Sequence, residues 1–264
     1  MKIKRNPFTS DIFTSKWLNH FNQNQSVFNF NFIMGLNFFK PGILPIFINT
    51  GQNLTKGISY SLATKNNFDF KKSVILIYDV PAYFDLDIIS IPENVQFHKI
   101  KQYPGYLIEL YKYKDFHDYL KKTFSKNTNK KLKKYQKRLE LCFHIEYKMF
   151  FGSISKGEYD FIFDCFRRLL EKRFADKQIT NNNLNLKEWA FYYDVAFPMI
   201  LEKRASLFVV YEKSNPIAVT LNYLSENILF DAITVFDIDY SKFNLGKIAL
   251  ANLVSWCFEN NIQY

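Results

Sequence analysis

A single glycine at the boundary between a strand pattern and a helix pattern is the feature of this sequence best suited to binding an anion. Residues 228–236 read as a strand, a polar loop follows over 237–245, and a helical pattern begins at Gly246. Free backbone N–H groups and the positive dipole end of a helix attract anions, and glycine lets a phosphate approach the backbone closely. Lys242 and Lys247 would add positive charge. The same pattern also fits an ordinary strand–helix turn in which the glycine only eases the bend.

Three polar residues near this junction could move protons. Tyr223 and Asp231 lie on predicted neighbouring strands, and Tyr240 lies in the loop before Gly246. Tyrosine hydroxyls and aspartate carboxylates can donate or accept protons in a reaction between two bound partners that the protein holds in position. Each residue also has a structural interpretation, because strand tyrosines and aspartates commonly serve packing or local hydrogen bonding.

The spacing of histidines and cysteines argues against a metal site. The four histidines show neither H-x3-H nor H-E-x-x-H spacing, and the three cysteines are never in a C-x-x-C pair. An odd number of widely spaced cysteines also argues against a disulfide framework and favours a reducing compartment. We therefore expect no metal and no G-x-S-x-G or Cys/His nucleophile chemistry.

Positive charge is concentrated in one segment. The net charge is +10, and residues 121–140 hold nine Lys or Arg and one acid, which leaves +2 for the rest of the chain. Leu132, Tyr135 and Leu139 form one apolar stripe of a helix there. The segment is either a solvated helix face or, over Lys126–Arg138, a surface for a polyanion such as RNA, nucleotide phosphates or an anionic envelope surface.

The elements that must position these residues follow from the periodicity of the apolar residues. Residues 1–120 predict short strands and turns after one helix, and residues 115–264 alternate longer helices with strands. The expected fold class is α/β. The helices are predicted at 8–21, 115–141, 158–174, 187–204 and 246–260, and the strands at 28–32, 43–48, 74–78, 96–100, 106–110, 143–149, 206–211, 217–224 and 228–236.

Two segments resemble a known family. ASLFVVYEKSNPIAVTLNY and ILFDAITVFDIDYSKFNLGKIALANLVSWCFENN are similar in order to the GNAT-fold acyltransferases, in particular the BioF2-like/CelD acetyltransferase group related to the FemAB peptidyltransferases. SKNTNKKLKKYQKRLE resembles the Lys/Arg-rich helix that precedes the domain in that group. The resemblance implies tandem GNAT-like halves with mixed, mostly antiparallel sheets flanked by helices. They would be a degenerate half at 1–120, a basic linking helix at 121–145 and an acyltransferase half at 146–264.

The resemblance also implies acetyl-CoA or another acyl-CoA as co-substrate, held by a loop of the pattern R/Q-x-x-G-x-G/A. Gly246 matches the central glycine, whereas Phe243 replaces the usual Arg or Gln and Ile248 the usual Gly or Ala. These departures fit the divergent group better than a typical small acetyltransferase. The implied cofactor-binding set is Val235, Phe236, Lys242, Phe243, Asn244, Leu245, Gly246, Lys247 and Ile248.

We therefore expect an acyl-CoA-dependent N- or O-acyltransferase that acts on an envelope or polysaccharide precursor or another small acceptor. The alternatives are a FemAB-like aminoacyl transferase that uses aminoacyl-tRNA, with the tRNA bound by the basic helix, and a non-catalytic GNAT-like binding module. No apolar run of 18 residues and no signal peptide is readable, which predicts a cytoplasmic protein without a membrane span. The family continues with a further strand after residues 261–264, so we expect the domain to be truncated there.

Overall fold

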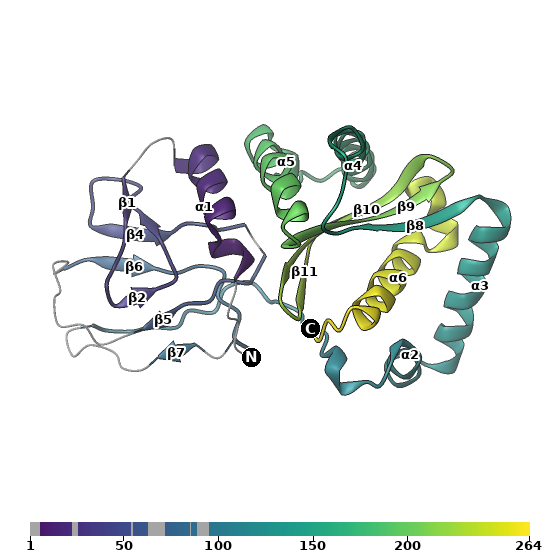
Figure 1. The fold of residues 1–264 in the computed structure, drawn as a ribbon, viewed down its shortest axis with the longest axis horizontal. Coiled ribbons are helices and arrows are strands. Elements are labelled where there is room, and N and C mark those ends of the chain that lie inside the picture. Colours follow the sequence, from purple (N-terminus) through teal and green to yellow (C-terminus); the bar gives the residue numbers. More distant parts are fainter. Residues whose placement is uncertain (1–5, 23–25, 54, 63–71, 85, 89–94) are drawn as a thin grey trace. The chain divides into compact units, whose positions relative to one another are not determined.

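The chain divides into two compact units. The structure is a computed structural model that describes residues 6–22, 26–53, 55–62, 72–84, 86–88 and 95–264 (Figure 1). The units are Met1–Tyr106 and Leu107–Tyr264. The chain is of the mixed α/β class, as expected. The degenerate GNAT-like half at 1–120 stays a prediction.

A four-stranded antiparallel sheet forms the centre of the second unit. Its strand order is β11-β10-β9-β8, so each strand pairs with its neighbour in the chain. Tight turns at Lys213 and Glu226, both with positive φ, join the last three strands. The strands are β8 (Ile145–Phe150), β9 (Ala205–Glu212), β10 (Asn215–Ser225) and β11 (Ile228–Phe236). All four confirm strands predicted from the sequence.

Helices cover both faces of this sheet (Figure 1). Helices α4 (Lys156–Lys177) and α5 (Leu186–Leu201) pack on one face, and α6 (Leu245–Glu259) packs on the other. Because side chains alternate along a strand, one set of residues on β10 and β11 faces α4 and α5 while the other faces α6. This separation decides which polar residues can share a site.

The predicted helix at 115–141 is divided into α2 (Phe116–Thr123) and α3 (Lys126–Cys142). Ser125 separates them, because its hydroxyl oxygen accepts the backbone N–H of Thr128 at 3.2 Å and caps α3. Helix α3 packs on α6, with Leu139 buried in their shared cluster and with Leu132 and Tyr135 against it. The predicted apolar stripe is therefore the packed face of α3.

The first unit holds short strands in two sheets of order β1-β3-β4-β6 and β2-β5-β7. Its helical part is a 3-10 turn η1 (Pro7–Thr9), helix α1 (Asp11–Trp17) and a π turn η2 (Leu18–Asn22), which confirms the predicted helix. Among the described residues, the strands are β1 (Val27–Phe28), β2 (Ile33–Met34), β3 (Phe38–Phe39), β4 (Ile46–Asn49), β5 (Ser61–Leu62), β6 (Val74–Leu76) and β7 (Asp87–Ile88).

Two predicted strands are wrong, and the strand predicted at 28–32 is observed only as β1 (Val27–Phe28). Residues 96–100 and 106–110 form no strand, although each is a short segment that contains apolar residues. Ile100 and Tyr106 are 81% and 92% exposed. A strand is stabilised by its ladder partner and by burial of one face, and neither segment has these.

The last residues lie beside the start of β11. The Tyr264 N–H donates to the Asn227 carbonyl at 3.2 Å, and the Leu229 N–H donates to the Tyr264 carbonyl at 3.0 Å. These two bonds form one bridge of a parallel pair. The further strand, and with it truncation of the domain, stays a prediction.

No helix in the part of the chain that the structure describes is long and apolar enough to cross a membrane.

All three cysteines are free thiols. Cys142 is exposed, and burial raises the pKa of Cys257 to about 12.

Candidate functional site

The segment after β11 is held in place by α4. Lys172 of α4 donates to the carboxylates of Asp237 and Asp239, each at 2.6 Å. These hydrogen bonds, the one to Asp237 foremost, raise the pKa of Lys172. The carboxylates flank the start of the 3-10 turn η5 (Ile238–Phe243), so the ion pairs fix the path of the chain from β11 toward α6.

The N-terminus of α6 follows directly on η5. Asn244 adopts the left-handed conformation at φ 55°, which asparagine tolerates, and its carbonyl accepts the N–H groups of Lys247 and Ile248 at 2.9 and 3.1 Å. The N–H groups of Leu245 and Gly246 form no backbone hydrogen bond with a described residue outside η5 and α6. The first-turn N–H groups at the positive end of this 15-residue helix are suited to an anion.

Gly246 is required by packing. A Cβ atom there would lie 2.6 Å from the ring of Phe236, the last residue of β11. Arg173 covers this ring, with its guanidinium carbon 4.5 Å from the centroid, and donates to the Thr234 carbonyl at 3.2 Å. The glycine therefore lets the start of α6 approach the end of β11, a reason that the sequence did not reveal.

Cations without acidic partners surround the start of α6. The Lys242 ammonium and the Arg138 guanidinium lie 5.4 and 5.2 Å from the ring centroid of Phe243, and Lys247 is exposed. Within the described ranges, none of these three cations forms an ion pair with a carboxylate. Their charge is available to an anion at the start of α6.

Several residues of the predicted cofactor-binding set have buried side chains. Val235, Leu245 and Ile248 are fully buried, and Phe243 is 3% exposed. They could contact a cofactor only through their backbone atoms. Tyr240 is half-buried with its ring 5.1 Å from Phe143, and burial is the main cause that raises its pKa.

A β-bulge in β11 brings two polar residues together. Leu221 pairs with Ile233 but Asn222 pairs with Asp231, so Ala232 is an extra residue on β11. Regular alternation would place residues 231 and 234 on opposite faces; with the bulge, the Thr234 hydroxyl donates to the Asp231 carboxylate at 2.8 Å. Asp231 is exposed, yet desolvation of its carboxylate by the surrounding protein raises its pKa. The hydrogen bond from Thr234 has a smaller effect and lowers it.

A row of polar side chains crosses the sheet beside Asp231. Fully buried Asn222 pairs in register with Asp231 on one side and Ser206 on the other, and its amide nitrogen donates to the Ser206 hydroxyl oxygen at 3.3 Å. The Thr220 and Thr234 hydroxyl oxygens are 3.2 Å apart. Sequence reasoning missed this row, although polar residues inside apolar strands were its visible signal.

The amide oxygen of Asn222 has no hydrogen-bond partner in the described part of the chain. A buried acceptor without a partner is costly and calls for an explanation. The Asn222 amide nitrogen donates to Ser206 on one side, and the residue that pairs with Asn222 on the other side is Asp231.

Tyr223 lies apart from this row. It is fully buried on the opposite face of β10, where it interacts electrostatically with Tyr192 of α5, and burial raises its pKa well above the usual value. The structure therefore brings Asp231 together with Thr234 and Asn222 but does not bring it together with Tyr223.

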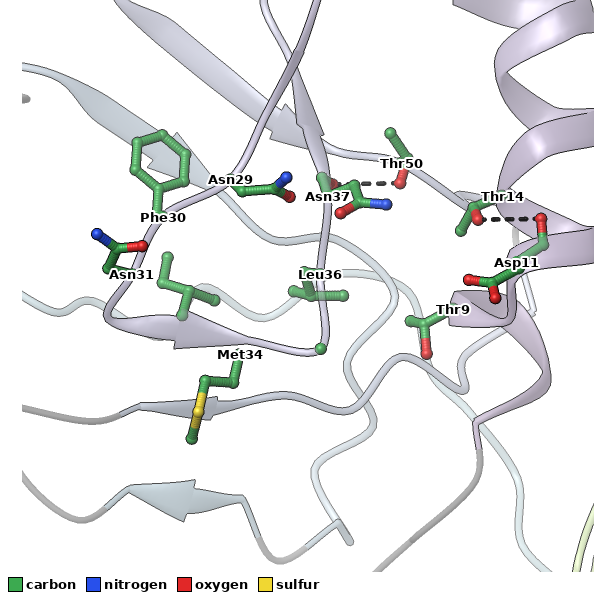
Figure 2. A pocket seen from close by; sticks show the side chains of 12 residues that line it. Thr9, Asp11, Thr14, Asn29, Phe30, Asn31, Met34, Leu36, Asn37 and Thr50 are labelled. Atoms are coloured by element: carbon green, nitrogen blue, oxygen red, sulfur yellow. Dashed lines mark hydrogen bonds between the residues drawn. The ribbon is translucent and has the colours of Figure 1, made fainter.

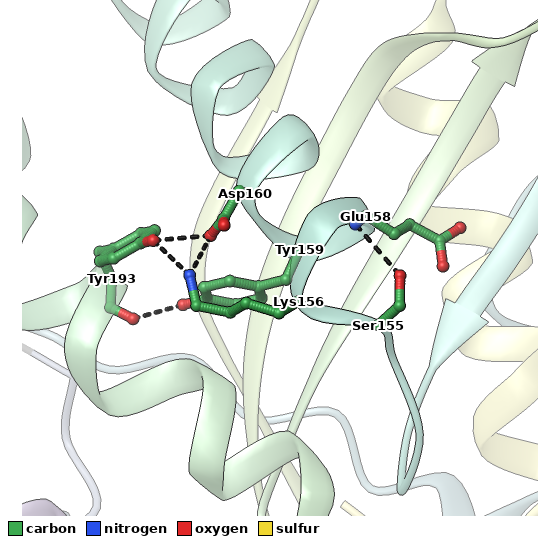
Figure 3. A network of polar contacts seen from close by, with 6 residues as sticks. All are labelled: Ser155, Lys156, Glu158, Tyr159, Asp160 and Tyr193. Carbon is green, nitrogen blue, oxygen red and sulfur yellow. Dashed lines mark hydrogen bonds and ion pairs between the residues drawn. The ribbon is translucent and has the colours of Figure 1, made fainter.

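A second polar cluster joins α4 to α5 (Figure 3). The Tyr193 hydroxyl donates to Asp160 at 2.6 Å, and Lys156 donates to both residues. The Lys156 hydrogen bond is the main cause that lowers the pKa of Asp160. Every charge here has a partner, so we assign the cluster to holding the two helices together.

The second unit is an α/β domain with two features that could serve group transfer. The N-terminus of α6 could hold an anionic donor, and the carboxylate of Asp231 on the edge strand β11 could accept a proton. No group of His, Cys, Asp and Glu in the described residues could hold a metal. Residues 123–264 match the model of the acetyltransferase (GNAT) domain, which is more than half of the chain, and the chain belongs to this family. The chemistry of the class is acyl transfer. No curated protein matches the chain.

Proposed function

We propose that this protein is an acyl-CoA-dependent N- or O-acyltransferase whose phosphate site is the start of α6. One observation carries the proposal. The start of α6, which is the positive end of the helix dipole and has Lys242 and Lys247 beside it without ion-pair partners in the described residues, comes a few residues after β11, the strand that holds Asp231. This combination supplies both an anion site and a proton acceptor.

The residues present fit a pyrophosphate group. The first turn of α6 supplies the positive end of the helix dipole, and Lys242, Lys247 and Arg138 supply charge that forms no ion pair with an acid of the described chain. Buried side chains at 243 and 248 imply that backbone donors would make the main contacts. The bound acyl-CoA supplies the activated acyl thioester.

The strand β11 sets the distance between the proposed phosphate site and Asp231, the proposed proton acceptor. Asp231 and Phe236 pair with Asn222 and Ala218, which are four residues apart on β10, and this corresponds to about 13 Å along the strand. An extended pantetheine arm could follow β11 over this length, and the bulge at Ala232 lies between its ends. This arrangement supports placing acyl transfer near Asp231.

In this proposal Asp231 accepts the proton that the acceptor's N–H or O–H group loses as its nitrogen or oxygen attacks the thioester carbonyl. Thr234 acts as a positioning residue, because its hydroxyl orients the ionised carboxylate. Once protonated, Asp231 can donate to the unpartnered amide oxygen of Asn222. The neighbouring Asn222 thus stabilises the form of Asp231 that transfer produces.

The acceptor remains the least specified part of the proposal. An envelope or polysaccharide precursor, or another small acceptor, is supported by the resemblance of the sequence to the BioF2-like/CelD group. The reaction requires only a nucleophilic amine or hydroxyl that can reach Asp231.

Calorimetric titration with acetyl-CoA and CoA tests the phosphate site. We expect the double variant Lys242→Ala/Lys247→Ala to bind roughly 5- to 30-fold more weakly, because each exposed ion pair with a phosphate contributes up to about 1 kcal/mol. Lys121→Ala/Lys177→Ala, which removes two exposed charges elsewhere, is the matched control. Equal affinity in both double variants, or no binding of CoA by the wild type, would contradict the proposed site.

The exposed face of α3 favours a second candidate function, aminoacyl transfer from tRNA. None of its cations forms an ion pair with an acid in the described residues. They span about 18 Å of helix. The apolar face of α3 is packed on α6, so it cannot insert into a lipid surface. The exposed cations are Lys126, Lys130, Lys131, Lys133, Lys134, Lys137 and Arg138.

Salt-dependent binding of bulk tRNA distinguishes this candidate. If α3 binds phosphates, the triple variant Lys130→Glu/Lys134→Glu/Lys137→Glu should make the slope of log Kobs against log salt shallower by about 2 to 3. A control triple variant reverses three exposed lysines elsewhere, at Lys99, Lys101 and Lys114. Equal slopes in the two triple variants would exclude α3 as the tRNA surface. Binding of CoA without turnover of any acceptor would instead favour the non-catalytic binding module.

A further inference from the structure

The first unit contains a polar pocket unconnected with the elements of the proposed transfer site. Its volume is about 500 Å³, within the usual range for small-molecule sites. Three parts of the unit line it: the η1–α1 segment, residues 29–37, and Thr50 at the end of β4. In Figure 2 the side chains of Asn29 and Asn37 lie on one side, and those of Thr9 and Asp11 on the other.

The walls of the pocket are held by hydrogen bonds and ring contacts. The Phe30 carbonyl accepts the Ile33 N–H at 2.9 Å, which forms a turn between β1 and β2. The Phe30 ring lies 4.9 Å from the ring of Phe38, edge to face. On another wall, the Asn37 carbonyl accepts the Thr50 N–H at 2.8 Å and the Thr50 hydroxyl at 3.2 Å. These contacts use backbone atoms of the lining asparagine and leave its side chain available.

The lining has a distinctive chemistry. The side-chain amides of Asn29, Asn31 and Asn37 have no hydrogen-bond partner among the described residues, and each amide offers both donors and an acceptor. Asp11 is the one charged residue in the lining, and the lining contains no base. Phe30 also lines the pocket, but it is 3% exposed and its ring packs against Phe38, so the polar groups dominate the surface that a ligand would meet.

We propose that this pocket binds a neutral polyhydroxylated molecule of the sugar type. A hydroxyl group both donates and accepts, so it matches the amides and can donate to the Asp11 carboxylate. The carboxylate and the absence of any lining base disfavour phosphorylated or otherwise anionic ligands. The site goes beyond the proposed transfer reaction and stands whether or not the second unit binds CoA.

Saturation-transfer NMR on the full chain tests this pocket, with glucose, N-acetylglucosamine and glucose 6-phosphate as probes. We expect at least one neutral sugar to bind saturably with roughly millimolar affinity. The anionic probe should bind more weakly than glucose. Asn37→Ala and Asp11→Ala should each weaken the binding of the neutral sugar by roughly tenfold, the effect of losing a hydrogen bond.

Exposed Asn19 of η2, which does not line the pocket, gives the matched control variant Asn19→Ala. Circular dichroism and thermal unfolding establish that each variant is folded; if Asn37→Ala is not, Asn31→Ala at the exposed turn replaces it. No saturable binding of either neutral sugar, stronger binding of glucose 6-phosphate, or equal affinity in the pocket and control variants would overturn the proposal. CoA titration of the same samples separates this result from failure of the transfer site.

Discussion

Replacing Asp231 by Asn is expected to lower kcat by roughly 10²- to 10⁴-fold, the usual contribution of a positioned general base. The amide cannot accept the proton that the acceptor loses. Binding of CoA and thermal stability should change little, because the residue is exposed and its side-chain hydrogen bond is to Thr234 on the same edge strand. Acetyl transfer to a panel of amines and sugars, measured by release of free thiol, reads out kcat once an acceptor is found.

The control for this prediction is Asp176→Asn, which neutralises an exposed aspartate on α4. A kcat for Asp231→Asn within about twofold of the control, less than 0.5 kcal/mol, would exclude Asp231 as the base. The pH profile gives an independent check. Because the pKa of Asp231 is raised, activity should fall on acidification at a pH above the ordinary aspartate range. Thr234→Val should move this acid limb to still higher pH, because the variant removes the hydrogen bond that lowers the pKa of Asp231. Thr234→Ser keeps a hydroxyl group and should keep the acid limb of the wild type.

Substituting Ala for Gly246 is expected to destabilise the second unit by about 1–3 kcal/mol, the usual cost of overpacking. The new Cβ would meet the Phe236 ring at 2.6 Å, and either α6 or the ring must move. Movement of α6 would displace its N-terminus, the proposed phosphate site, so CoA affinity should fall together with stability. Chemical denaturation and calorimetric titration measure the two effects.

Gly157 provides a matched control, because it occupies the corresponding second position of α4 and a Cβ there meets nothing within 4 Å. Gly157→Ala should leave stability unchanged or raise it by up to about 1 kcal/mol, the helix propensity difference. Adding Phe236→Leu to Gly246→Ala should recover part of the lost stability, as expected for residues in contact. Similar losses at both glycines would show that the contact with Phe236 is not the cause.

The second unit was largely predictable because its elements are long and their apolar periods are clear. The strand over 228–236 was predicted at its observed bounds, and the helix that follows begins one residue earlier than predicted. Residues 96–100 and 106–110 show the limit, since these short segments were predicted as strands but have no strand partner. Whether a partner exists depends on tertiary structure, which local periodicity does not contain.

The candidate site was predictable only in part for a similar reason. The position of a helix start after a strand follows from local pattern, so Gly246 was found. The clustering of Asp231 with Thr234 depends on one extra residue in β11, and the polar row with Asn222 depends on register between strands. Neither is encoded in a short window of sequence. Burial also could not be judged locally, which is why Tyr223 appeared equivalent to Asp231.

The extra residue Ala232 also sets how β11 tolerates changes in length. Deleting it would restore simple alternation and turn every side chain from residue 233 onward to the other face of the sheet. Phe236 would then leave the start of α6, and Thr234 would leave Asp231, so one deletion would disrupt the anion site and the carboxylate together. Over long divergence, we therefore expect this strand to accept many substitutions but to conserve its number of residues.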